Sequence, residues 1–502
     1  MEKNFQELKK LLQEVSDLEY AAGVLSWDQS TYMPVKGAAA RGRQLATIGK
    51  LAHEKFTSPA IGNLLESLAT YEDSMPYEST EASLIRLARK QYEKALRVPS
   101  SFVSKLYNHS SETYQVWTKA RPENDFAAVL PYLEKTLEYS RELASFHPYE
   151  HIADPLIAEV DPGMKTAEIR NVFAQLRKEL VPLVQAITEQ ADFDPACIHQ
   201  PFAIQDQEAV CKDIVGKLGY DFERGRLDTT HHPFMTNFSI DDVRITTRYQ
   251  ENDLSDSLFS TIHEAGHALY ELGVDSSLEG TPLASGTSSG VHESQSRLWE
   301  NLVGRSLPFW EFYYPQLQKA FPEQLNNVSL TTFYRAINRV QRSLIRTDAD
   351  EVTYNLHVII RFDLELAMLE GKLAVRDLPE AWHARYKSDL GIQAPDDRDG
   401  VLQDIHWYMD TIGGSFQGYT LGNIMSAQFY DAALSSHPDI PQQISQGNFT
   451  VLHNWLQENI YQHGRKFSAD EILQKATGSS LMIDPYIRYL KSKFGELYNL
   501  SL

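Results

Sequence analysis

Apolar residues recur at spacings of three and four along most of this chain, which is the pattern of amphipathic helices. Most of these stretches also have plausible capping residues at their ends. No internal repeat, low-complexity tract or Gly/Ser-rich linker interrupts them, so no domain boundary is visible. The pattern predicts a mainly α protein with helices at residues 3–25, 80–96, 125–145, 166–190, 206–218, 254–272, 293–303, 330–345, 350–373, 402–411, 421–435, 450–461 and 469–476.

Persuasive strand signals are confined to residues 225–249, where two segments are rich in β-branched residues. These segments, 226–230 and 243–249, predict a small antiparallel β-sheet directly before the helix at 254–272. Such an edge strand is able to pair with an extended peptide backbone. A short hairpin that only packs on the helix fits the pattern equally well, so the sequence leaves both interpretations open.

The helix at 254–272 contains His263-Glu264-Ala-Gly-His267. Positions four apart lie on the same face of a helix, so the two imidazoles are able to bind one metal ion. Glu264 is placed to reach a metal-bound water without being a ligand. The plain alternative is a helix surface with two exposed histidines and a solvated glutamate. We favour the metal site because the motif continues the helical pattern and further candidate ligands follow it.

A tetrahedral catalytic zinc site needs a third protein ligand and an open fourth position. One helix does not easily supply three ligands, so Glu271 is expected to support the site or to be solvated. Glu293 begins a new helical stretch after a flexible Gly/Ser-rich segment, and a carboxylate from a second, crossing helix would complete a His₂Glu site. Glu293 is therefore the first choice and Glu300 the second. The weaker candidates, in the loop between the helices, are Asp275 and Glu279.

Composition excludes several classes of protein. The 502 residues are 42% hydrophobic and 23% charged, and no stretch approaches eighteen uninterrupted apolar residues, so a soluble globular protein is expected and a membrane protein is not. The net charge of −21 disfavours nucleic acids and anionic membranes as partners. With only Cys197 and Cys211, and no signal-peptide pattern in the first residues, we expect a cytoplasmic protein without disulfides.

Further motifs, from about residue 25 to 425, make the chain resemble the carboxypeptidase Taq family of zinc metallocarboxypeptidases. Together they are far more specific than the histidine motif alone. They are Trp27-Asp28-Gln-Ser-Thr-Tyr32-Met33-Pro34, His232-Pro233-Phe234, Asp242-Val-Arg244-Ile-Thr246, His292-Glu293-Ser294-Gln295, Ile345-Arg346-Thr-Asp-Ala349-Asp350 and Gly400-Val-Leu-Gln403-Asp404-Ile-His406-Trp407.

One stretch departs from the family pattern. Where the family has Phe-Pro-Thr-Tyr, this chain has Phe416-Gln417-Gly418-Tyr419. Tyr419 is retained, but the loss of the proline and the threonine leaves open how stiff this segment is and where Tyr419 lies.

The resemblance implies a single catalytic domain spanning residues 1–502, with a deep active-site cleft that the helices of residues 1–110 cover. The sheet and the metal-binding core would occupy residues 225–303. It also implies a homodimer and supports His263, His267 and Glu293 as zinc ligands, with cobalt or manganese as possible substitutes. The implied reaction releases single C-terminal amino acids from peptides, with broad side-chain tolerance.

Zinc chemistry makes Glu264 the general base that activates water and then carries the proton to the leaving amine. Tyr419 or His406 would donate a hydrogen bond to the developing oxyanion. The alternatives are a buried tyrosine with a satisfied hydroxyl and a core histidine beside Trp407.

Recognition of a free C-terminal carboxylate favours a bidentate arginine. The resemblance selects Arg346, with Arg244 as second choice. Arg346 could instead be a helix-surface residue paired with Asp348 or Asp350, and Arg244 could hold the sheet beside the cleft. His232 would contact the substrate or gate the cleft, or be only a loop histidine.

Two rival functions remain at this point. A zinc oligopeptidase that cuts inside short peptides would have the same metal motif. A non-catalytic zinc-binding or peptide-binding protein is the rival from another class, but a purely structural metal site has no need of Glu264 and would usually close its fourth position.

Overall fold

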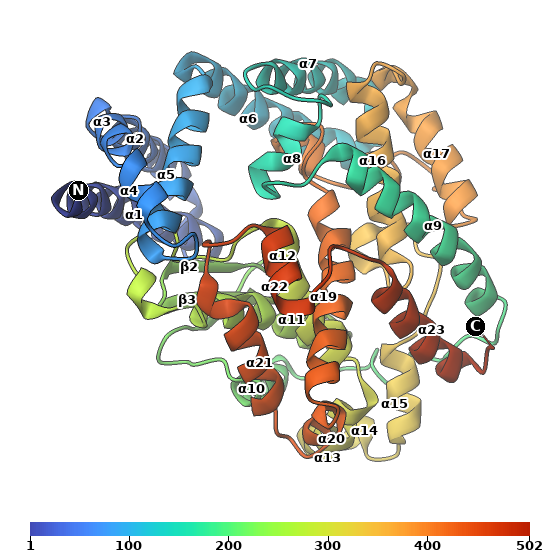
Figure 1. Ribbon diagram of the computed structural model, residues 1–502. Helices are drawn as coiled ribbons and strands as arrows, with labels where there is room; N and C mark the ends of the chain where they lie inside the picture. Colours follow the sequence, from blue (N-terminus) through green and yellow to red (C-terminus); the bar gives the residue numbers. More distant parts are fainter. Residues whose placement is uncertain (502) are drawn as a thin grey trace.

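The structure is a computed structural model that describes residues 1–501, and most of these residues are helical. The first helices form a group on one side of the molecule (Figure 1, blue): α1 (Glu2–Thr31), α2 (Ala38–Phe56), α3 (Pro59–Ser67), α4 (Ala69–Ser74) and α5 (Thr80–Arg97). The next five are α6 (Ser100–Glu123), α7 (Phe126–Ser145), α8 (Asp154–Val160), α9 (Thr166–Thr188) and α10 (Ile204–Leu218).

After a small sheet, helices make up the rest of the fold (Figure 1, green to red). They are α11 (Leu254–Leu272), α12 (Ser289–Arg297), α13 (Leu307–Ala320), α14 (Pro322–Leu325), α15 (Leu330–Ile337), α16 (Tyr354–Leu369), α17 (Leu378–Asp389), α18 (His406–Met409), α19 (Gln417–Ser436), α20 (Ile440–Ser445), α21 (Thr450–Asn459), α22 (Ala469–Thr477) and α23 (Asp484–Tyr498). Within the described residues, none of these helices combines the length and the apolar character that a membrane span needs.

The predicted mainly α fold is confirmed, and the helices predicted at 330–345, 350–373 and 402–411 are shorter than expected. The helix predicted at 330–345 ends at Ile337, because the backbone N–H groups of Val340 and Gln341 bond to Tyr498 and Asp350 instead of continuing the helix. The helix predicted at 402–411 reduces to α18. Periodicity missed several helices altogether, including α6, α13, α17 and α23.

The sheet is mixed, so the prediction of an antiparallel sheet is wrong in one of its pairings. It contains β1 (Leu227–Thr229), β2 (Met235–Ser239) and β3 (Asp242–Thr247) in the order β1-β3-β2. The sequence patterns did not identify β2, which forms the hairpin with β3 and is antiparallel to it. Strand β1 pairs with the other edge of β3, and these two strands run parallel.

Two glycines allow the helices of the central region to cross closely. A Cβ atom on Gly266 of α11 would lie 2.6 Å from the Cα of Ser296 in α12. A Cβ atom on Gly422 of α19 would lie 2.5 Å from the Cβ of Glu293, also in α12. Any side chain at either position would push the helices apart. These glycines therefore bring α11, α12 and α19 together around Glu293.

Apolar side chains form one large core that runs through the helices from α6 to α23. A second core joins the N-terminal helices to the segment after α11, where Leu8 and Leu12 of α1 pack with Val274 and Leu278. The N-terminal group is thus held to the region that follows the histidine motif.

Candidate active site

The structure brings His263, His267 and Glu293 together. Nε2 of His263 and Nε2 of His267 lie 3.6 and 3.4 Å from Oε2 of Glu293, and one atom from each residue lies within 4.8 Å of the others. Tetrahedral ligands at about 2.0–2.1 Å from a zinc ion are themselves about 3.4 Å apart. The three side chains therefore fit a zinc-like divalent ion, with α11 supplying two ligands and α12 the third.

A ring of polar contacts orients these three side chains. Nδ1 of His263 lies 2.9 Å from Glu300, and Arg297 donates hydrogen bonds to both Glu293 and Glu300, at 2.7 and 3.1 Å. A π-helical turn at residues 298–303 places Glu300 beside this arginine. Because Nδ1 of His263 is used in this way, its Nε2 is left facing Glu293. We call these residues, together with His267 and His292, the metal cluster.

The second histidine is held through a relay that sequence reasoning did not foresee. Nδ1 of His267 lies 2.7 Å from Nδ1 of His292, whose Nε2 lies 2.7 Å from Glu271. Glu271 is buried and also accepts hydrogen bonds from Ser285 and from the backbone of Gly286. Glu271 therefore supports the site, as its position on the same helix suggested, and Glu300 supports His263.

Carboxylates in the metal cluster are held ionised. Burial by itself would raise the pKa of Glu293, but Arg297 and His263 hold it well below its usual value. For Glu300 the same balance, with Arg297 and His263 again opposing burial, lowers the pKa to about 2. Ionised carboxylates are the form that binds a metal.

Glu264 is only 7% exposed and has no hydrogen-bond partner among residues 1–501. Burial raises the pKa of its carboxyl to about 7, while the neighbouring His263 opposes this shift. The carboxyl group lies next to the ligands with its oxygens uncommitted, as a base toward a water would require.

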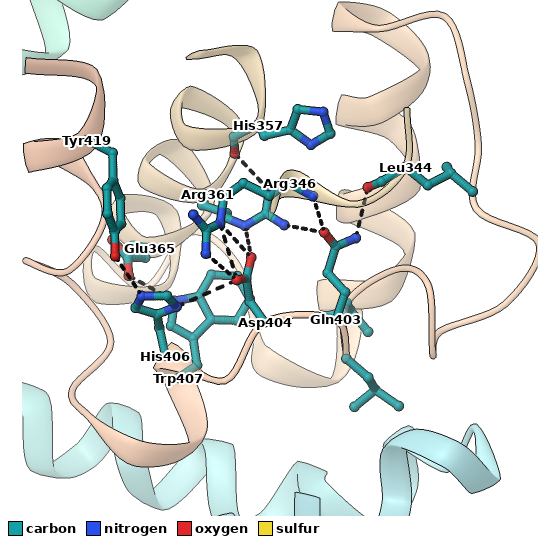
Figure 2. Close-up of polar contacts among 12 residues, drawn as sticks. Leu344, Arg346, His357, Arg361, Glu365, Gln403, Asp404, His406, Trp407 and Tyr419 are labelled. Carbon is teal, nitrogen blue, oxygen red and sulfur yellow. Dashed lines mark hydrogen bonds and ion pairs between the residues drawn. The ribbon is translucent and has the colours of Figure 1, made fainter. Parts of the chain in front are cut away.

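His406 lies between Tyr419 and Asp404 (Figure 2). Nε2 of His406 is 3.2 Å from the hydroxyl of Tyr419, and Nδ1 is 3.6 Å from Asp404. Both residues line the main cavity. They therefore remain paired candidates for hydrogen-bond donors, and neither is a core residue sealed away from the cavity.

Arg346 is buried, with 6% of its surface exposed, and its partner is Asp404 (Figure 2). Nη2 donates to Asp404 at 2.8 Å and Nη1 donates to the hydroxyl of Tyr354 at 3.0 Å. Arg361 pairs with the same carboxylate. The alternative of a surface arginine paired with Asp348 or Asp350 is thus wrong. We call Arg346, Arg361, Asp404 and His406 the arginine cluster.

The arginine cluster carries two guanidinium groups against one carboxylate, so a positive charge remains. His232 faces this cluster: burial, and then the charges of Arg346 and His406, lower its pKa. The structure therefore brings His232, Arg346 and His406 together, although the loop between β1 and β2, the short turn at 346–348 and α18 are distant in the sequence.

Arg244 is the candidate that lies apart. It forms a bidentate pair with Asp242 at 2.7 and 2.8 Å, and its guanidinium covers the rings of Trp27 and Phe238 at 4.4 and 4.9 Å. These contacts join the sheet to α1. They favour the interpretation that Arg244 holds the sheet beside the cleft.

The segment that departs from the family pattern is held firmly. Gln417 donates to Asp161 and to the carbonyl of Gly414, both at 2.9 Å, and Asp161 accepts from the backbone of Gly290 at 2.7 Å. A Cβ atom on Gly418 would lie 2.6 Å from Oγ of Ser289. The buried carboxylate of Asp161 thus joins the start of α19 to the start of α12. Helix α19 carries Tyr419, and α12 carries Glu293.

A cavity of about 1280 Å³ lies beside His406 and Tyr419. These two residues line one part of it, and α1, α2, α5 and the segment around α8 line other parts. The N-terminal helices therefore line the cavity that His406 and Tyr419 reach.

Known proteins resemble this chain over almost its full length. A family model described as carboxypeptidase Taq (M32) metallopeptidase matches residues 7–494. Thermostable carboxypeptidase 1 of Thermus thermophilus is 38% identical over 505 residues, covering 98% of this chain and 99% of that protein. Carboxypeptidase 1 of Bacillus subtilis is 36% identical, covering 97% of each. The crystal structure of an M32 carboxypeptidase from Deinococcus radiodurans R1 is 49% identical, with a TM-score of 0.97, covering 99% of this chain and 100% of that one.

Proposed function

This chain belongs to the carboxypeptidase Taq (M32) family of metallopeptidases and is a metallocarboxypeptidase, and from that premise we propose that it uses zinc and Glu264 to release single residues from free peptide C-termini. The observation that carries the proposal is the convergence of His263, His267 and Glu293 beside an uncommitted Glu264. A purely structural metal site would not leave such a carboxyl group unpaired.

The three ligands would hold a divalent ion that lowers the pKa of a coordinated water toward about 7 and polarises the scissile carbonyl. Glu264 then takes a proton from the attacking water and delivers it to the amine that leaves. Glu300 and His292 keep the two imidazoles turned toward the metal position while this happens. Each of these side chains is positioned by α11, by α12 or by the π-helical turn at 298–303 that follows α12.

Tyr419 and His406 supply hydrogen bonds where negative charge develops on the former carbonyl oxygen. Their mutual contact of 3.2 Å holds both groups together on the cavity wall. Burial raises the pKa of Tyr419 well above its usual value, so the hydroxyl keeps its proton and remains a donor.

The arginine cluster binds the C-terminal carboxylate of the substrate. Support comes from its residual positive charge and from the position of one of its members, His406, on the cavity wall. Asp404 already uses one edge of Arg346, so the carboxylate would contact the remaining donor surface and be joined by His232. Arg244 is not part of this proposal.

Mass spectrometry of one N-blocked peptide, prepared as free acid and as amide and incubated with and without a chelator, tests the function. We expect stepwise loss of single C-terminal residues from the free acid alone, and chelator should abolish it. Internal cuts in both peptides would replace this proposal with the oligopeptidase. Metal binding without any cleavage would replace it with a binding protein.

Zinc as the metal, with cobalt or manganese as substitutes, and broad side-chain tolerance are parts of this proposal. The single catalytic domain, the homodimer, the cytoplasmic location and the lack of nucleic-acid or membrane partners stay predictions from the sequence. In the structure Cys197 and Cys211 are both free and buried.

A further inference from the structure

Arg465 differs from the other arginines around the active site. Arg297, Arg346 and Arg361 each form an ion pair with a carboxylate. The guanidinium group of Arg465 has no hydrogen-bond or ion-pair partner among residues 1–501, and it lines the cavity. A guanidinium offers five donors in a planar fork, so a partly buried one without an acceptor is open to a ligand.

The backbone around Arg465 is firmly held, so the free side chain does not reflect a loose segment. The N–H group of Arg465 donates to the carbonyl of Leu283 at 3.0 Å, and Gly464, at φ +50°, approaches that carbonyl so closely that a Cβ atom would lie 2.2 Å from it. Arg86 bonds to the next carbonyl, that of Lys466, at 3.1 Å. Arg465 is therefore presented to the cavity from a fixed position between the segment at 461–463 and α22.

Arg465 and Lys90 are two cations on the cavity wall that lack a carboxylate partner within the described part of the chain. Lys90 of α5 lines the cavity without an ion pair, whereas Lys94 one turn later pairs with Glu159 at 2.8 Å. The acids whose charges act on Arg465 are Glu271 of α11 and Glu19 of α1, and neither forms an ion pair with it. Both cations therefore keep donors for a ligand that carries its own acceptor.

The position of the proposed carboxylate site determines the direction in which a bound peptide runs. If the C-terminal carboxylate lies at the arginine cluster, a peptide must pass His406 and Tyr419, and its upstream residues then enter the cavity that Arg465 lines. This step rests on the proposed function. We propose that Arg465, assisted by Lys90, binds an acidic side chain of the substrate upstream of the scissile bond, so that the enzyme favours peptides with Asp or Glu at one upstream position.

A set of N-acetylated peptides with free C-termini tests this inference. Each carries Glu or Gln at one upstream position in an otherwise alanine sequence, so the members of a pair differ only in charge. We expect the wild-type protein to show kcat/KM about tenfold higher for Glu than for Gln at one position, the size of one charge-assisted contact. Acetylation removes the N-terminal charge, which could otherwise bind Glu19.

Arg465→Gln should bring the Glu/Gln ratio close to one, and Arg465→Lys should retain part of the preference. Glu19→Gln should increase the ratio, because it removes the opposing charge. Arg376→Gln is the matched control: its side chain is 75% exposed and pairs only with the adjacent Asp377, so the ratio should stay at the wild-type value. Thermal unfolding and metal content of each variant establish that it is folded and loaded.

Three results would overturn the inference and leave the proposed function intact: no upstream position separates Glu from Gln in the wild type, Arg465→Gln lowers all peptides equally, or Arg465→Gln removes the preference for free acids over amides. The last result would make Arg465 the C-terminal carboxylate site. If no peptide loses a C-terminal residue, the proposed function and this inference are both wrong.

Discussion

The metal cluster and the arginine cluster both bury several charged groups, but they are built in different ways. In the metal cluster the three candidate ligands lie on α11 and α12, and close helix crossings at Gly266 and Gly422 set their separation. In the arginine cluster Arg346 and Asp404 come from loops and short turns, and their mutual ion pair holds them in place. The metal cluster therefore depends on backbone packing, whereas the arginine cluster depends on charge balance.

This difference has functional consequences. Side chains fixed by helices keep their geometry before a metal binds, which suits a site that must coordinate and activate. Arg346 and Arg361 share one carboxylate, that of Asp404, so one positive charge is not neutralised. A net positive charge suits a site that receives an anion. Variants of each cluster should consequently fail in different ways.

The largest effect is expected in the metal cluster. Glu264→Gln keeps the shape of the side chain but removes the base, so turnover should fall by about 10²–10⁴-fold. Metal content should be unchanged, because Glu264 is not a ligand. Rates under saturating substrate and elemental analysis measure the two quantities. Turnover close to that of the wild type would contradict the role of Glu264.

The arginine cluster should respond through substrate binding. Arg346→Ala should reduce kcat/KM for free-acid peptides by an amount equivalent to about 2–5 kcal/mol, because a buried charge pair with the carboxylate is lost. Arg346→Lys keeps the charge but loses the planar fork and should recover only part of the activity. Cleavage of the amide form is the control. An unchanged preference for the free acid would place carboxylate recognition elsewhere.

The close helix crossing beside Glu293 can be disrupted by a substitution that alters no charged residue. Gly422→Val should reduce the free energy of unfolding by about 1–3 kcal/mol through overpacking. It should also weaken metal binding, because the new side chain meets Glu293. Gly49→Val in α2 is the matched control, since a Cβ atom there has no neighbour within 4 Å. Equal stability and metal affinity in the two variants would refute the importance of the crossing.

The smallest expected effect concerns pH and a carboxyl group beside the arginine cluster. Glu365 accepts a hydrogen bond from Trp407 at 2.8 Å, and burial raises its pKa to about 8 from a usual value of 4.5, against the opposing effect of Trp407. The folded protein thus retains a proton that the unfolded chain releases, so this group destabilises the fold increasingly as pH rises from 4.5 to 8.

Glu365→Gln keeps an acceptor for Trp407 but does not titrate. The melting temperature of the wild type should therefore fall relative to that of Glu365→Gln between about pH 5 and pH 8. Parallel melting curves across this range would show that Glu365 is ionised in the folded protein. The variant also tests whether charge balance limits stability near the arginine cluster.

The sequence by itself predicted the mainly helical fold and the shared helix face of His263 and His267, and it ranked Glu293 ahead of Glu300 as third ligand. Helical periodicity is a local property, and residues four apart share a face whatever surrounds the helix. The same reasoning predicted the helix at 254–272, which the structure confirms as α11, and it placed Glu264 beside the two histidines. It missed β2, because few residues of that strand carry a strong pattern.

Only the tertiary structure decided which distant side chains meet. Asp404 as the partner of Arg346, His292 as the link between His267 and Glu271, Asp161 as the tie between α12 and α19, and the unpaired Arg465 all depend on how helices cross. The parallel pairing of β1 depends on which strand forms the hairpin with β3. Contacts between residues far apart in the chain are set by the packing of whole elements, and no short sequence pattern encodes that packing.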